Sequence, residues 1–107
     1  MKKLIRNKIV ERLDVSEWEV ITDQYQLNHL YALKVQEELN EIISARFQDG
    51  LEFADLIDVA YAFANANGFT AAEIDSLRSQ KEVLRGGFSD IVLTNLDPDN
   101  PSNQIYK

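Results

Sequence analysis

Apolar residues recur at spacings of three and four between residues 23 and 85, which is the period of a helix with one buried face. Turn signals at Asp49-Gly50 and Gly68 divide this stretch into three segments. Asp23 or Thr22 can cap the first segment, and "TAAE" at residues 70–73 has the form of a capping box that opens the third. The pattern therefore predicts an all-α fold with three helices.

The short connections predict an antiparallel arrangement in which the first two helices form an αα-hairpin. We expect a first helix of about 25 residues from Asp23, a second from about Leu51 to Asn67, and a third that stops at "GG", residues 86–87. Residues 4–21 show no clean period, so their structure stays open, with "WEVIT" as a short strand or an extended segment. Residues 91–96, "IVLTNL", are predicted to be extended. Residues 1–96 are expected to form one domain, followed by a polar tail over 97–107.

Composition excludes several classes of function. The 107-residue chain carries a net charge of −7, which argues against binding to a nucleic-acid backbone. It contains no cysteine, so disulfides, thiolate zinc sites and a cysteine nucleophile are ruled out. No run approaches the roughly 20 apolar residues of a membrane span, and the first residues lack the apolar stretch of a signal peptide. These features predict a cytoplasmic protein that does not bind membranes.

Carboxylates are crowded on the first two predicted helices. In "KVQEELNEI", residues 34–42, Glu38 and Glu41 lie on one helical stripe with Glu37 at its edge. On the second helix Glu52 and Asp55 are one turn apart, and Asp58 lies a further turn along; both stripes border an apolar stripe. If the apolar stripes of a hairpin pack together, four or five carboxylates converge.

Such a cluster is unfavourable on its own, because two like charges 4 Å apart cost about 4 kcal/mol at an effective dielectric near 20. A divalent cation removes that cost, and oxygen ligands without His or Cys favour Mg²⁺ or Mn²⁺ over zinc. The alternative is an acidic helix face in contact with solvent, which explains either pair of acids alone.

Basic residues form a stripe on the third predicted helix, where Arg78, Lys81 and Arg85 are spaced at i, i+3 and i+7. Arg6 and Lys8 near the N-terminus carry charge of the same sign. These cations either neutralise the carboxylates directly or bind phosphate oxygens of a ligand.

Four segments of the chain, in order, resemble one protein family. "EELNE" at residues 37–41 and "EFAD" at 52–55 have the form E-E-x-x-E…E-x-x-D, and "KLIRNKIVERL" and "KEVLRGGF" flank them. Together these segments resemble the MazG-like nucleoside triphosphate pyrophosphatases, of the all-α NTP pyrophosphatase superfamily, over residues 3 to about 93. Asn7 stands where one branch of the family has Asp, which puts any role of that residue in doubt, and Val10 stands where it has Pro.

The resemblance implies a set of functional residues. The metal ligands would be Glu38, Glu41, Glu52 and Asp55. Lys34, Lys81 and Arg85 match basic positions suited to phosphate contact. The general base would be a glutamate of the first motif, with Glu37, Glu38 and Glu41 left open. Five aromatic residues are further candidates for stacking on a base, although packing explains most buried aromatics: Trp18, Tyr25, Tyr31, Tyr61 and Phe88.

The implied activity is Mg²⁺-dependent hydrolysis of a (d)NTP between its α and β phosphates, giving the monophosphate and pyrophosphate in a house-cleaning role. The resemblance also implies a homo-oligomer, a dimer or a tetramer, in which two hairpins form a four-helix bundle. Two alternatives stay open. One is a phosphoribosyl-ATP pyrophosphatase, and the other is a non-catalytic helical interaction module of the same fold.

Overall fold

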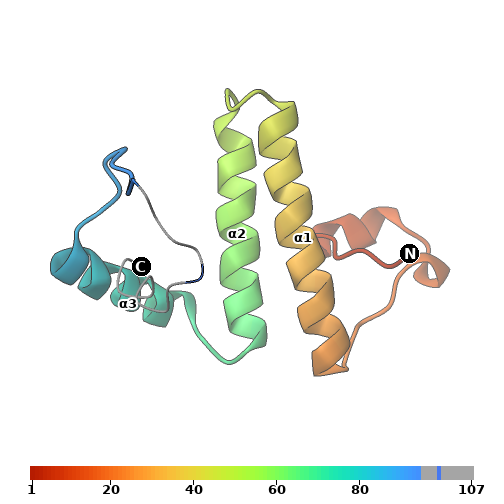
Figure 1. Cartoon of the computed structure of the whole chain (residues 1–107). Coiled ribbons are helices and arrows are strands. Elements are labelled where there is room, and N and C mark those ends of the chain that lie inside the picture. Colours follow the sequence, from red (N-terminus) through yellow and green to blue (C-terminus); the bar gives the residue numbers. More distant parts are fainter. Residues whose placement is uncertain (95–98, 100–107) are drawn as a thin grey trace.

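The fold is all-α over the residues that the computed structural model describes, which are residues 1–94 and Asp99 (Figure 1). Its elements are the 3₁₀ helices η1 (Asn7–Arg12) and η2 (Val15–Glu17), followed by α1 (Gln24–Ser44), α2 (Gly50–Ala66) and α3 (Ala71–Arg85). The described residues contain no strand, so the all-α part of the predicted fold is confirmed. Residues 18–22 and 91–93 form neither helix nor strand. The rest of "IVLTNL" from residue 95, and all of the predicted tail except Asp99, lie outside the described residues.

The predicted helix boundaries agree closely with the structure, because the capping residues act as expected. Asp23 caps α1 and accepts a hydrogen bond from the Gln26 backbone N–H at 2.9 Å. Gly68 follows the end of α2 with a φ of 93°, the left-handed conformation that glycine adopts without strain. Thr70 caps α3 by accepting from the Glu73 N–H at 3.1 Å. The first helix is 21 residues long, somewhat shorter than predicted.

Helices α1 and α2 form the predicted antiparallel hairpin and lie side by side (Figure 1). The turn between them needs left-handed backbone at Arg46 and Phe47, whose φ angles are 56° and 62°. The Phe47 N–H donates to the Ile42 carbonyl at 3.0 Å and closes α1, while Asp49 caps α2 through the Leu51 N–H at 3.0 Å. This tight connection fixes which residues of the two helices face one another.

Helix α3 packs against α2 and lies on the side of α2 away from α1 (Figure 1). The Tyr61 hydroxyl donates a hydrogen bond to Asp75, and Arg78 Nε lies 3.6 Å from Asp75 Oδ1. Charged residues of α3 are therefore carried away from α1, on which Glu38 lies.

The core of a single chain is small. Among the described residues only Leu30 and Ile42 are buried large apolar side chains, and Tyr31 stacks on Phe63 with ring centroids 5.2 Å apart. Large apolar side chains are exposed on both helices of the hairpin, among them Leu39, Ile43, Phe53 and Ile57. One chain alone therefore leaves much apolar surface uncovered.

Ile42→Ala is expected to lower the free energy of unfolding by about 2–4 kcal/mol, because it opens a cavity at the most buried apolar position of the hairpin. That is a large part of the ~5–15 kcal/mol that holds a domain folded. Urea unfolding followed by circular dichroism measures it. Val83→Ala, at an exposed position of α3, is the control and should change stability little. Equal losses in the two variants would mean that Ile42 is not a core residue.

No helix in the described part of the chain is both long and apolar enough to cross a membrane.

Candidate metal centre

Three carboxylates from the two helices of the hairpin meet at one place. Oxygens of Glu38 on α1 and of Glu52 and Asp55 on α2 all lie within 4.8 Å of one another. Glu52 and Asp55 are three residues apart and share a face of α2, and the antiparallel hairpin brings Glu38 opposite them. Glu38 is only 7 % exposed, and the other two are half-buried. This group is called the acid triad below.

The ionised form of Glu52 is destabilised in this arrangement. Loss of hydration raises the pKa of its carboxyl above the ordinary 4.5, and the negative charges of Glu41, Asp49, Asp55 and Glu38 raise it further. Within the described residues no cation forms an ion pair with Glu52. A cation bound to the triad would relieve that repulsion. Three clustered carboxylates with no nitrogen or sulfur donor form a set of hard oxygen ligands, which suits Mg²⁺ or Mn²⁺.

Lys34 and Lys3 form ion pairs with two of the acidic residues of α1. Lys34 Nζ lies 3.3 Å from Glu38 Oε1 and 3.4 Å from Glu37 Oε1, and Lys3 Nζ lies 2.7 Å from Glu37 Oε1. The hydrogen bond from Lys3 is the largest cause of the lowered pKa of Glu37. Glu37 is therefore ionised and forms ion pairs with both lysines.

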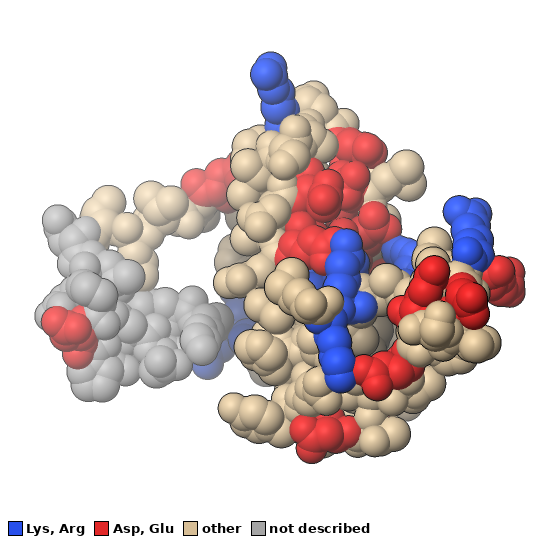
Figure 2. Space-filling model, turned by 90° about the vertical axis from the view of Figure 1, so that its right-hand side faces the viewer, with Lys and Arg blue, Asp and Glu red and all other residues tan. Residues whose placement is uncertain are grey.

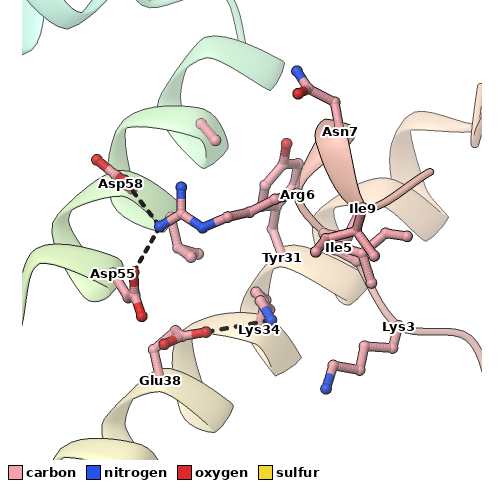
Figure 3. A pocket seen from close by; sticks show the side chains of 13 residues that line it. Lys3, Ile5, Arg6, Asn7, Ile9, Tyr31, Lys34, Glu38, Asp55 and Asp58 are labelled. Carbon is pink, nitrogen blue, oxygen red and sulfur yellow. Dashed lines mark hydrogen bonds and ion pairs between the residues drawn. The ribbon is translucent and has the colours of Figure 1, made fainter. Parts of the chain in front are cut away.

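Arg6 forms ion pairs with two of the acidic residues of α2. Its guanidinium Nη2 donates to Asp55 Oδ1 at 2.7 Å and to Asp58 Oδ2 at 3.0 Å (Figure 3). Arg6 precedes η1, so a residue near the N-terminus reaches across to α2. The contact places a flexible cation directly on one member of the triad.

A cleft of about 640 Å³ opens beside the triad, between the N-terminal arm (residues 1–13) and the hairpin (Figure 3). Its lining combines three kinds of residue. The acids are Glu38, Asp55 and Asp58, the cations are Lys3, Arg6 and Lys34, and the remaining residues are Leu4, Ile5, Asn7, Ile9, Tyr31, Val59 and Ala62. Figure 2 shows acidic side chains gathered in one patch on this face, with Lys and Arg side chains lying against it. The cleft therefore has a charged part at the triad and an apolar part along the arm.

The predicted metal ligands fall into two groups. Glu38, Glu52 and Asp55 belong to the triad. Glu41 lies outside it, because its side chain is exposed on the turn of α1 that follows Glu38. It remains near enough for its charge to raise the pKa of Glu52.

The predicted phosphate-binding residues also divide. Lys34 and Arg6 line the cleft beside the triad. Lys8 is exposed on η1 and does not line it, and neither do Lys81 and Arg85, which are exposed on α3. Within one chain, the cations that line the cleft belong to the arm and to α1, and none of them belongs to α3. Lys3 was not predicted as a site residue. Its position three residues before Arg6, in a segment rich in basic residues, could have indicated it.

Comparisons with protein-family models, curated proteins and solved structures gave no match for this chain. A functional assignment therefore rests on the site itself and on the sequence motifs.

Proposed function

We propose that this protein is a metal-dependent nucleoside triphosphate pyrophosphatase, which hydrolyses its substrate between the α and β phosphates. The observation that carries the proposal is the convergence of Glu38, Glu52 and Asp55 within 4.8 Å, beside a cleft whose lining includes three cations. The E-E-x-x-E…E-x-x-D motif, which resembles that of the MazG-like enzymes, gives this site its expected chemistry.

The triad would hold Mg²⁺ or Mn²⁺, with Glu41 as the fourth ligand. When bound, the cation supplies Lewis-acid activation of the phosphoryl group. The chain's own contribution is to present three carboxylates from two rigid helices, which limits the rearrangement that binding requires.

Cations of the cleft would bind the substrate phosphates. Lys34 is fixed on α1, and its side chain is only 17 % exposed, so it presents a positioned charge beside the triad. Arg6 and Lys3 reach the same region from the arm. The role predicted for Lys81 and Arg85 stays a prediction, because a single chain does not bring α3 to the cleft.

Glu41, through the carboxylate oxygen that does not bind the metal, is the best candidate for the base that accepts the proton of the attacking water. Glu37 is held by Lys3 and Lys34, and its lowered pKa makes it a weaker base. Glu38 is buried and paired with Lys34. Glu41 is exposed and has no ion pair within the described residues.

The nucleoside would lie along the apolar part of the cleft. Tyr31 lines this part while its ring stacks on Phe63, so the side chain is fixed before a ligand binds. Ile5 and Ile9 line the cleft from the arm. A planar base suits a surface of this kind.

The protein is further proposed to work as a homo-oligomer, a dimer or a tetramer, in which the hairpins of two chains form a four-helix bundle. The support is the set of exposed apolar side chains on both helices of the hairpin, among them Leu39, Ile43, Phe53 and Ile57.

A second candidate is a non-catalytic helical interaction module. It is favoured by the ion pairs of Lys34 and Arg6, which already neutralise part of the triad without a metal. Metal binding separates the two candidates, because a module of this kind does not need it.

Mg²⁺ at about 100 times its dissociation constant should stabilise the folded protein by about 2.7 kcal/mol, since it binds only the folded triad. For a domain of this size that corresponds to a rise of roughly 10 °C or more in Tm. Differential scanning calorimetry with Mg²⁺ and with EDTA tests the metal site. K⁺ at the same ionic strength serves as the ion control and should leave the Tm unchanged. An unchanged Tm at millimolar Mg²⁺ and Mn²⁺ would favour the interaction module.

A further inference from the structure

Arg6 links two parts of the chain that are far apart in sequence. It lies 49 residues before Asp55, yet its guanidinium is 2.7 Å from an oxygen of that triad carboxylate. Asp58, the second partner, is outside the triad. A cation thus sits on a carboxylate that the proposed function needs for metal.

We infer that Arg6 is an exchangeable counter-ion of the metal site: it pairs with Asp55 when no metal is bound and moves to the substrate phosphates when metal and nucleotide bind. This inference rests on the proposed function. According to this inference, Arg6 has two opposite effects. It weakens the binding of free metal and strengthens the binding of the metal–nucleotide complex.

The contacts of Arg6 are suited to exchange. Its side chain is 59 % exposed, and exposed ion pairs are weak, so leaving Asp55 costs little. Asp58 lies one turn beyond Asp55 on α2 and is also exposed, so it can retain the guanidinium after a metal has taken Asp55. The planar guanidinium matches both a carboxylate and a phosphate, which makes Arg suitable for both states.

The other two cations of the cleft are not placed for such an exchange. Lys34 belongs to the same helix as Glu38 and is largely buried, so it stays with the site in either state. Lys3 pairs with Glu37, which is outside the triad. Arg6 is therefore the cleft cation that contacts a triad carboxylate from outside the hairpin.

Repulsion within the triad explains why the exchange is coupled to the ligand. Without metal, the positive charge of Arg6 offsets part of the negative charge of the triad, because its guanidinium lies 2.7 Å from Asp55 Oδ1. A divalent cation at the triad removes that repulsion and repels the guanidinium. A triphosphate brings new negative charge to the same cleft, where Arg6 can bind it. Free metal alone therefore has to displace Arg6, whereas metal with nucleotide gives it a new partner.

The test uses Arg6→Gln in the full chain, with Arg12→Gln as the control. Arg12 lies on η1, is exposed, forms no ion pair within the described residues and does not line the cleft, so the control makes the same charge change outside the site. Binding is measured by isothermal titration calorimetry with two probes. The first is Mn²⁺ alone, and the second is an α,β-methylene nucleoside triphosphate, which resists hydrolysis, in saturating Mn²⁺. Circular dichroism checks that the variants are folded.

We expect Arg6→Gln to bind Mn²⁺ alone about threefold more tightly than Arg12→Gln, because the competing ion pair is lost. The same variant should bind the Mn²⁺–nucleotide complex about tenfold more weakly, because a charged hydrogen bond to phosphate is lost. The opposite signs are the result that the inference requires.

Three outcomes would overturn it. Weaker binding of both probes would mean that Arg6 positions Asp55 for the metal and does not compete with it. Values equal to those of Arg12→Gln would make Arg6 a surface charge. If the wild-type protein binds no Mn²⁺, the proposed function itself fails and the inference fails with it. In the first two outcomes the proposed function stands.

Discussion

Glu52→Gln is expected to abolish nucleotide hydrolysis and to raise the Tm of the metal-free protein. Glu52 is the triad member that forms no ion pair within the described residues, and loss of hydration, together with repulsion from neighbouring acids, raises the pKa of its carboxyl. A neutral amide of the same shape relieves that repulsion but is a poor ligand for Mg²⁺. Turnover should fall more than about 100-fold, the upper range for changes that only support a ligand. Calorimetry in EDTA and a pyrophosphate-release assay measure the two effects.

The gain in stability should depend on pH. Because folding raises the pKa of Glu52 above its ordinary 4.5, the folded state binds this proton more tightly than the unfolded state. The proton's stabilising contribution is complete below about pH 4.5 and is lost as the pH rises through the folded pKa. The variant should therefore exceed the wild type in Tm at pH 7 and approach it at pH 4. Glu37 has a lowered pKa and an opposite dependence, but it is the same in both proteins, so it cancels in the difference.

Glu82→Gln is the matched control for this experiment. Glu82 is exposed on α3 and is outside the triad, so the variant has the same change in net charge without the change in the site. It should keep both turnover and the Tm of the wild type. An increase in Tm equal to that of Glu52→Gln would attribute the effect to overall charge, and retained turnover in Glu52→Gln would exclude Glu52 as a metal ligand.

The second large effect is expected from Phe53→Glu. Phe53 is 45 % exposed on α2, and on a helical wheel it lies roughly opposite Asp55, so the change leaves the cleft side of the helix intact. In the proposed bundle a buried carboxylate at this position would have no partner, which is strongly unfavourable. The oligomer should dissociate. Because a single chain buries few apolar side chains, the Tm should also fall by about 10 °C or more.

Size-exclusion chromatography with light scattering, followed by calorimetry, measures dissociation and stability together. Val15→Glu is the control, since Val15 is a more exposed apolar residue on η2, outside the hairpin. It should keep the wild-type mass. A wild-type protein that is a well-folded monomer would contradict the proposed oligomer, and so would a Phe53→Glu protein with the wild-type mass.

The three α-helices could be predicted because local signals define them. Apolar spacing, the caps at Asp23 and Thr70, and the turn before Gly50 are properties of neighbouring residues, and tertiary structure did not override them. The arm was left open for the converse reason. Its residues have no period, and no local pattern predicts that residues of η1 line a cleft together with residues of the hairpin.

The site was predicted in part. A helical wheel places Glu38 and Glu41 on one stripe, but it does not say where a second helix crosses that stripe. In the structure Glu38 is buried against α2 and Glu41 is exposed. The helical wheel likewise predicts a basic stripe on α3, but it does not say where α3 lies relative to the triad. Because α3 lies beyond α2, the cations beside the triad are Lys34, Lys3 and Arg6. Contacts between residues 49 positions apart, such as that of Arg6 with Asp55, need the fold to be seen.

The central claim is metal-dependent cleavage between the α and β phosphates. Its most direct test is to incubate the purified protein with a panel of (d)NTPs, in Mg²⁺ and in EDTA, and to separate the products by ion-exchange chromatography. The account predicts nucleoside monophosphate and pyrophosphate in equal amounts with Mg²⁺, and neither product with EDTA. Diphosphate with orthophosphate would show that the bond is assigned wrongly. No turnover of any nucleotide or of phosphoribosyl-ATP would contradict the enzymatic account and leave the interaction module.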